Sequence, residues 1–179
     1  MPKSIPPFER MPPQEIDLPD AHIHLRLFNK KDSHILLELA SDESVQRYVP
    51  WAKSITGTRS AQTTLERFGS AWDRGIMARY AVEAEGAVVG YAGLWSDQKP
   101  GFYEFGFAFL PSQRSKGYGT SVVARLLTVM QDDLHAQGAI AYVDDTNNAS
   151  KVVVQKLGFI PTEEFDDGDR RYVKAFETN

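Results

Sequence analysis

The chain has 179 residues, of which 42% are hydrophobic and 25% are charged, and its formal net charge is -4. This length suits one domain with a single core. The negative charge argues against a general nucleic-acid binder, which would usually present a basic face. Because the chain has no cysteine, disulfides, thiolate nucleophiles and cysteine-type zinc sites are excluded. We see no signal peptide and no apolar run near the roughly 20 residues that span a bilayer, so we expect a cytoplasmic protein without a membrane partner.

The first 20 residues hold six of the 10 prolines. Proline removes backbone donors and disfavours helix, so we expect residues 1–20 to form an extended or mobile arm. Ile5, Phe8 and Ile16 could strap this arm across the domain, although a disordered tail fits the composition equally well. We expect residues 21–179 to form one folded domain.

Alternating and helically spaced apolar residues predict the elements of that domain. In chain order they are a strand at 22–28, helices beginning near 32, 42 and 58, strands at 80–84, 88–95 and 102–110, a helix at 120–137, a strand at 139–143, a helix beginning near 147, and strands at 159–165 and 171–176. Gly138 stands where a C-terminal cap of the 120–137 helix belongs. Asp167-Gly168 is a hairpin signal between the last two strands. This order describes a mixed α/β (α+β) single domain without internal repeats.

The segment from Phe107 to Thr120 carries the strongest chemical signal. A predicted strand enters it and an amphipathic helix leaves it, and the turn between them is Arg114-Ser115-Lys116-Gly117-Tyr118-Gly119. The start of a helix offers unpaired amides and a partial positive charge, and the two glycines let the backbone approach a bulky anion closely. The segment therefore predicts a loop that binds a pyrophosphate.

Other phosphate-binding loops fit this turn less well. A Walker A loop ends in Gly-Lys-Ser/Thr, whereas Gly119 is followed by Thr120 and Ser121. A dinucleotide-binding fingerprint needs a third glycine where Val122 stands. The turn could also be a glycine-rich connection that binds no ligand.

Two blocks of the sequence resemble the GNAT N-acetyltransferase superfamily. The pattern Arg-x-x-Gly-x-Gly between a strand and a helix resembles its acetyl-CoA motif. The block Asn147–Phe159 resembles the Asn-x-x-Ser and Lys-Leu-Gly-Phe block of the RimJ/RimL-like branch, which acetylates protein N-termini, polyamines and other small amines. With weaker matches at His24–Leu27 and Arg47–Trp51, the likeness covers about residues 22–176. It implies an acetyl-CoA-dependent N-acetyltransferase.

The resemblance also implies the fold and the place of the co-substrate. We expect a mixed, largely antiparallel sheet of about seven strands flanked by about four helices. Its fourth and fifth strands, 102–110 and 139–143, would splay apart to admit the pantetheine. The backbone of Phe107, Ala108 and Phe109 would pair with the pantetheine, and one of these amides could stabilise the oxyanion. The residues implied to hold the rest of acetyl-CoA are Arg114, Ser115, Lys116, Gly117, Tyr118, Gly119, Thr120 and Asn147, although Asn147 could equally be a helix cap.

Proton transfer needs an acid and a base. Many members of the superfamily carry a tyrosine that protonates the leaving thiolate, and Val154 stands at that position here. Ser150 lies one helical turn earlier on the same face and is the nearest alternative, unless it bonds its own backbone. Glu104 is our first candidate for the base that takes the amine proton, although a solvated strand carboxylate explains it too.

The resemblance places the acceptor site between the segment after the first helix and the C-terminal hairpin. Tyr48 and Trp51 could wall this site or be ordinary core aromatics. The hairpin holds an acidic cluster that could attract a cationic amine or be an exposed turn: Glu163, Glu164, Asp166, Asp167 and Asp169. The histidines show no metal-ligand spacing, so we expect no metal.

We expect the acceptor to be a small-molecule amine or a peptide N-terminus, and a homodimer is a further possibility. A non-catalytic acyl-CoA-binding sensor or regulatory domain would keep the same loop and is the alternative function. A nucleotide-phosphate-binding module of another class is a third.

Overall fold

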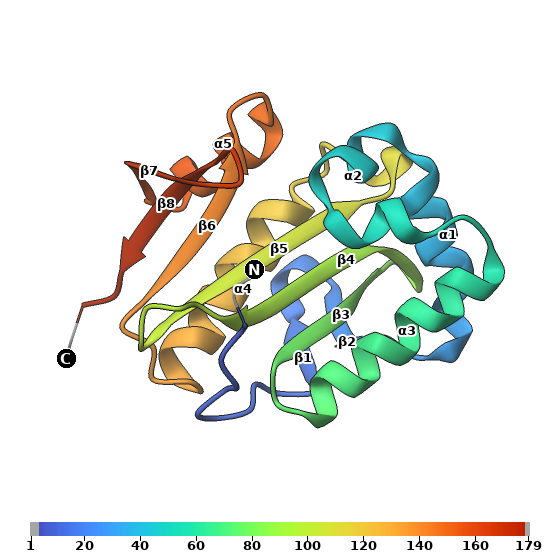
Figure 1. Cartoon of the computed structure of the whole chain (residues 1–179), viewed down its shortest axis with the longest axis horizontal. Helices are drawn as coiled ribbons and strands as arrows, with labels where there is room; N and C mark the ends of the chain where they lie inside the picture. The colour runs from blue at the N-terminus through green and yellow to red at the C-terminus, as the bar shows by residue number, and fades with distance from the viewer. Residues whose placement is uncertain (1–3, 178–179) are drawn as a thin grey trace.

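The computed structural model describes residues 4–177 and shows one sheet with helices on both of its faces (Figure 1). Within these residues the sheet has eight strands in the order β1-β2-β3-β4-β5-β6-β8-β7. The strands are β1 (Glu15–Leu18), β2 (Ile23–Leu27), β3 (Met77–Ala84), β4 (Ala87–Ser96), β5 (Phe102–Phe109), β6 (Gly138–Asp144), β7 (Ile160–Asp166) and β8 (Asp169–Ala175). All neighbours in this part of the chain pair antiparallel except β5 and β6. The expected mixed, largely antiparallel α/β sheet is confirmed, with one strand more than predicted.

Helices α1, α2 and α3 cover one face of the sheet, and α4 covers the other (Figure 1). The helices are α1 (Ser33–Ser41), α2 (Glu43–Tyr48), α3 (Thr58–Asp73), α4 (Tyr118–Asp132) and α5 (Asn148–Lys156), with short 3-10 turns η1 (Pro19–Ala21), η2 (Lys30–Asp32), η3 (Pro50–Ser54) and η4 (Pro111–Gln113). The apolar stripe of α4 is buried against the sheet as its spacing predicted, and α5 packs beside α4 and β6. Two cores result, one on each face.

The sheet opens between β5 and β6. These strands pair only from Phe102 to Glu104 and from Gly138 to Ile140, although both continue for several residues. Beyond Glu104 the two strands separate, and this gap is the expected splay. Because β1 precedes them, the splayed strands are the fifth and sixth of the sheet.

Strand β1 lies in the proline-rich arm, where no strand was predicted. Ile16 and Leu18 are buried and β1 pairs with β2 along its whole length. Pro13 and Pro19 flank this edge strand and do not interrupt it, which is where an edge strand tolerates proline. The prediction took the prolines as breakers and so overlooked the alternation between them.

Residues before β1 pack on the domain. The buried ring of Phe8 stacks on Tyr103 with 6.0 Å between ring centroids. The Phe8 amide donates to the Gly75 carbonyl at 2.6 Å, and the Tyr80 hydroxyl donates to the Pro13 carbonyl at 2.7 Å. Residues 1–3 of the expected arm and residues 178–179 of the expected domain lie outside the described part of the chain.

The end of α4 differs from the prediction. The helix stops at Asp132, whereas the apolar pattern predicted that it runs to residue 137. Gly138 is the first residue of β6 and no helix cap. A Cβ at Gly138 would lie 2.5 Å from the Lys174 carbonyl oxygen and 2.5 Å from the Phe102 ring, so close strand packing explains this glycine.

Candidate active site

The loop between β5 and α4 presents a row of unpaired backbone amides. Within residues 4–177, no protein group accepts a hydrogen bond from the amides of Ser115 through Thr120. Ser115 and Gly117 have φ of 63° and 85°, and left-handed residues in such a turn direct neighbouring amides into one concave surface. Gly117 is also the N-cap of α4. The loop can therefore bind an anion through its backbone and through the positive end of the helix.

The two glycines of this loop are explained by different structural requirements. A Cβ at Gly117 would meet nothing within 4 Å, so its left-handed φ explains the residue. A Cβ at Gly119 would lie 3.3 Å from the Phe107 ring and 3.6 Å from Val153. Gly119 therefore lets the start of α4 lie close to β5 and α5.

Arg114 ties this loop to the start of α2. Its Nη2 donates to Asp42 Oδ1 at 2.9 Å and its Nε donates to the Phe109 carbonyl at 3.1 Å. Asp42 also caps α2 by accepting from the Val45 amide at 3.0 Å. Partial burial acts to raise the pKa of Asp42, but the hydrogen bonds from Arg114, Ser44 and the Val45 amide outweigh it and hold that pKa at about 2. Asp42 thus stays ionised at neutral pH and fixes α2 beside the loop.

A cavity of about 340 Å³ fills the gap between β5 and β6. It is lined by α2, by the last residues of β5, by Arg114 and by the start of α5. Seven residues that the sequence analysis selected line it together: Tyr48, Phe107, Ala108, Phe109, Arg114, Asn147 and Ser150. Because β5 has no partner strand on this side beyond Glu104, the cavity can take an extended ligand beside the strand.

Two hydrogen bonds organise the rim of this cavity. The Tyr48 hydroxyl lies 3.0 Å from Thr146 Oγ1, and Thr146 in turn donates to Asp144. Asn147 accepts from the Ser150 amide at 3.1 Å, so it caps α5 and lines the cavity as well. The Ser150 hydroxyl has no hydrogen-bond partner among the described residues. It can therefore donate to a ligand.

Glu104 lies where the pairing of β5 and β6 ends. It is half-buried and does not line the 340 Å³ cavity, but it shares a face of β5 with Ala108, which does. Burial raises the pKa of Glu104 to about 8, and a hydrogen bond to Asp97 and the charge of Asp97 add to this effect, while the Trp95 side chain opposes it. A carboxyl with this pKa can accept a proton near neutral pH.

Tyr142 on β6 shares the surroundings of Glu104. Burial, with the charges of Asp97 and Glu104, raises the pKa of Tyr142 to about 12. Asp166 of the acidic hairpin adds its charge to both groups. The hairpin itself turns at Asp167-Gly168 as predicted.

An arginine neutralises part of the acidic cluster. Arg171 pairs with Glu164 of the cluster, whereas Arg170 pairs at 3.2 Å with Asp145, which lies outside the cluster. The charge of Asp166 acts on Glu104 and raises its pKa. The cluster thus contains an ion-paired carboxylate, Glu164, and a carboxylate that influences the sheet, Asp166.

Trp51 lies away from the cavity. Its indole packs edge-on against Phe68 and Tyr91, with 5.7 Å and 5.3 Å between ring centroids. Its Nε1 is buried without a hydrogen-bond partner among the described residues. The structure therefore separates Trp51 from Tyr48, the other aromatic residue selected with it.

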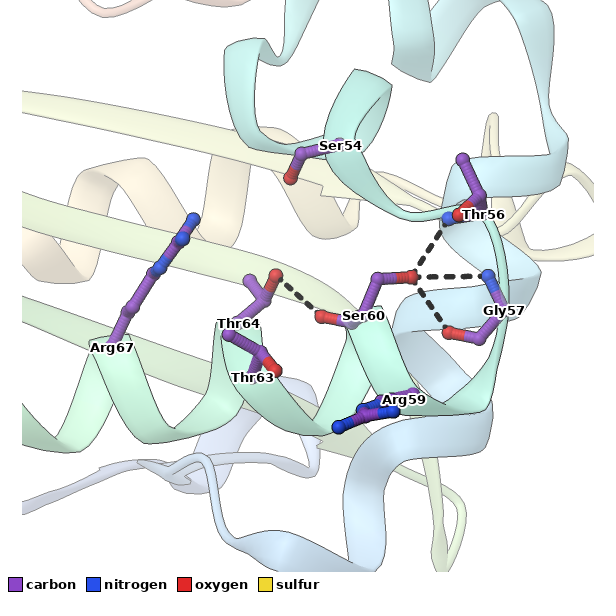
Figure 2. A pocket seen from close by; sticks show the side chains of 8 residues that line it. All are labelled: Ser54, Thr56, Gly57, Arg59, Ser60, Thr63, Thr64 and Arg67. Carbon is purple, nitrogen blue, oxygen red and sulfur yellow. Dashed lines mark hydrogen bonds between the residues drawn. The ribbon is translucent and has the colours of Figure 1, made fainter.

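A second cavity, of about 440 Å³, lies between η3 and α3 (Figure 2). Its lining is polar: Ser54, Thr56, Gly57, Arg59, Ser60, Thr63, Thr64 and Arg67. At the start of α3 the Ser60 hydroxyl accepts from the amides of Thr56 and Gly57 (Figure 2). No carboxylate or histidine lines it, so it offers no group that could take a proton from an amine.

The family is decided by a comparison with protein-family models. The model described as an acetyltransferase (GNAT) domain matches residues 22–160. The chain belongs to the GNAT acetyltransferase family. It is an acetyl-CoA-dependent N-acetyltransferase by class, and the resemblance of its sequence to the GNAT superfamily is confirmed.

Solved structures share this GNAT fold at low sequence identity. Mycobacterium smegmatis RimJ in complex with CoA-disulfide has a TM-score of 0.71 and 17% identity, over 86% of this chain and 81% of RimJ. A putative ribosomal-protein-serine acetyltransferase from Vibrio cholerae has a TM-score of 0.75 and 13% identity, over 92% and 99%. The microcin C7 self-immunity acetyltransferase MccE in complex with acetyl-CoA and AMP has a TM-score of 0.75 and 14% identity, over 87% and 93%. No curated protein sequence matches the chain significantly.

Metal-ligand clusters and membrane-spanning helices are both absent from the described residues of this GNAT chain. No group of three or more histidine, aspartate or glutamate side chains in residues 4–177 could hold a metal ion. No helix in the same range is both long enough and apolar enough to cross a membrane.

Several residues of the site lay beyond the sequence analysis. Asp42 and Thr146 contact Arg114 and Tyr48 across 72 and 98 residues of chain, and no local pattern marks such pairs. The sequence could have pointed to Asp97, because Asp97 directly follows β4 and so lies close to Glu104, the cross-strand partner of Trp95. The register of that hairpin was the missing information.

Proposed function

We propose that this chain transfers the acetyl group of acetyl-CoA to a primary amine, by direct attack of the amine within a ternary complex. The observation that carries the proposal is that the row of unpaired amides from Ser115 to Thr120 opens beside a cavity along the free side of β5. A pyrophosphate attached to a long, narrow chain matches this pair of features.

The co-substrate would lie along β5. The amides of the loop would hold the pyrophosphate, and the side chains of Arg114 and Lys116 add positive charge beside it. The pantetheine would extend through the cavity next to Phe107, Ala108 and Phe109, where strand amides lack a partner strand on the β6 side. One of these amides could donate to the oxyanion of the tetrahedral intermediate.

Two groups of this chain would move the protons. The amine nitrogen attacks the thioester carbon, and the proton that it loses passes to the Glu104 carboxylate, through water. The C–S bond then breaks and the sulfur leaves as a thiolate, which takes a proton that the Ser150 hydroxyl relays from solvent, or takes it from solvent directly. A thiolate is a fair leaving group, so the contribution of Ser150 is the smaller one.

The test is an assay of thiol release from acetyl-CoA with a panel of primary amines, with mass spectrometry of the products. Acetylated amine and stoichiometric free CoA are the expected result. Tight binding of acetyl-CoA without acetylation of any amine or peptide N-terminus would contradict the proposal and indicate a regulatory acyl-CoA binder.

A further inference from the structure

Arg79 is a cation without a counter-ion in the described part of the chain. It lies on β3 opposite Gly93 of β4, on the sheet face that carries α1, α2 and α3. Its guanidinium lies over three rings, at 4.7 Å from the centroid of Trp95, 5.3 Å from that of Tyr91 and 5.6 Å from that of Phe68. No carboxylate of residues 4–177 forms an ion pair with it.

The hydrogen bonds of Arg79 are incomplete as well. Nη1 donates to the Tyr91 hydroxyl, and Nε is buried without a partner among the described residues. The indole of Trp51 also packs against Tyr91, and its Nε1 is likewise buried without a hydrogen-bond partner among the described residues. Burial lowers the pKa of Arg79, as expected for a charge whose water has been removed without an anion to replace it.

Arg26 shows how the same sheet face satisfies a cation. It lies on β2, and its guanidinium donates to Asp32 at 2.8 and 2.9 Å and to Glu83 at 2.7 Å. Both arginines are partly buried, but among residues 4–177 carboxylates pair with Arg26 and not with Arg79. Removing an arginine from water without an anionic partner is costly, and stacking on rings compensates only in part. Arg79 is therefore suited to an anion that a ligand brings.

The position of Arg79 connects it to the candidate base. Trp95, on which the guanidinium stacks, pairs with Glu104 across β4 and β5, and its side chain hydrogen-bonds the Glu104 carboxyl. Gly93 and Gly106 pair directly between them, and the Trp95 ring and the Tyr91 hydroxyl lie over this glycine pair. The Arg79 guanidinium extends over Gly93, as shown by the 2.5 Å that would separate its Nη1 from a Cβ at Gly93. The indole thus contacts the cation through its ring and the carboxyl group through a hydrogen bond.

We infer that Arg79 binds a carboxylate of the acceptor, so that the substrate is an amine that also carries a carboxylate group. This inference rests on the proposed function, because it takes Glu104 as the group that faces the amine. The backbones of Arg79 and Glu104 are two strands and two residues apart, about 12 Å, and both side chains contact the Trp95 indole. The amine and the carboxylate are therefore separated by several bonds, as in an ω-amino acid or an N-terminal peptide with an early acidic residue.

The experiment compares acceptors that differ only in charge. One pair is 5-aminopentanoate and 5-aminopentanamide, and the other is the peptide amide Ser-Glu-Ala and its glutamine counterpart Ser-Gln-Ala. Binding is measured by calorimetry to the full chain saturated with CoA, so the result does not depend on turnover. The two pairs distinguish a free amino acid from a peptide as the source of the carboxylate.

In the wild type, the carboxylate member of at least one pair should bind at least about tenfold more tightly than its amide. In Arg79→Met this preference should fall below about threefold, and Arg79→Lys should retain part of it because the charge remains. Affinity for CoA should stay within about twofold in both variants. Equal binding of the two members of both pairs by the wild type would overturn the inference without any variant, and so would a preference that survives in folded Arg79→Met.

Failure of the proposed function gives a different result. If acetyl-CoA is never consumed but the carboxylate members bind through Arg79, the anion site stands and the transfer reaction does not. If amines are acetylated with no preference for a carboxylate, the transfer reaction stands and Arg79 is a structural cation held by its rings.

Discussion

Replacing Glu104 by glutamine should remove a pH dependence that this carboxyl imposes on acetyl transfer. Burial, with Asp97 beside it, raises the pKa of Glu104 to about 8. About a tenth of the enzyme therefore carries the ionised base at pH 7, half at pH 8 and about nine tenths at pH 9. If this form accepts the amine proton, kcat/KM of the wild type should rise about tenfold between pH 7 and 9.

The assay needs an acceptor that adds no slope of its own. An amine with a pKa below about 6 is neutral throughout this range, so the profile then reports the enzyme. In thiol-release measurements, Glu104→Gln should lower kcat/KM at pH 9 by about 100-fold and give a flat profile. Glu163→Gln, on the exposed hairpin, is the matched control and should follow the wild-type curve.

The thermal stability of the chain should also change in Glu104→Gln, in a direction that depends on pH. The folded pKa of Glu104 lies above its ordinary value of 4.5, so between these two values the folded chain holds a proton that the unfolded chain has released. Wild-type stability should fall as pH rises through this interval, and Glu104→Gln should unfold at a higher temperature than wild type at pH 9 but not near pH 5. A glutamine variant that keeps the alkaline rise in rate would refute the assignment of the base.

Three further substitutions test other parts of the site. Ser150→Ala should lower turnover about tenfold at most with unchanged affinity for acetyl-CoA, and lost affinity with unchanged turnover would make Ser150 a binding residue instead. Asp42→Asn should keep the cap of α2 but lose the charge facing Arg114, and urea unfolding should show a loss of stability below about 1 kcal/mol because Arg114 is 38% exposed. Because the pKa of Asp42 is lowered to about 2, the stability from this pair is present above about pH 4 and disappears as pH falls towards 2. Gly117→Val should weaken CoA binding at least about tenfold in calorimetry, since valine cannot readily adopt a φ of 85°, and an unchanged affinity in a folded variant would contradict the role of the loop.

Local patterns predicted the parts of the fold that local chemistry determines. The strand, turn and helix around Gly117 follow from alternation, a left-handed glycine and an apolar helical stripe, all between Phe102 and Asp132. The turn at Asp167-Gly168 follows from two residues that tolerate positive φ, which are 49° and 91° here. The errors were local too, since Gly138 was interpreted as a cap although the tertiary approach of Lys174 and Phe102 explains it.

The missing parts of the site depend on contacts between distant segments. The charge of Arg114 was recognised from the motif, but its partner Asp42 depends on how α2 packs over β5. The high pKa of Glu104 depends on burial and on the register that brings Asp97 beside it. The isolation of Arg79 is a property of its whole surroundings, because only the packed structure shows that no carboxylate of the described residues pairs with it.

The most direct test of the account is a titration of the ¹⁵N-labelled chain with CoA, followed through the backbone amide resonances. The account predicts that the largest shifts fall on Ser115 to Thr120, the unpaired amides of the loop, with a second group at Phe107 to Phe109 along the cavity. Shifts concentrated between Ser54 and Arg67, around the second cavity, or no saturable shifts at all, would contradict it.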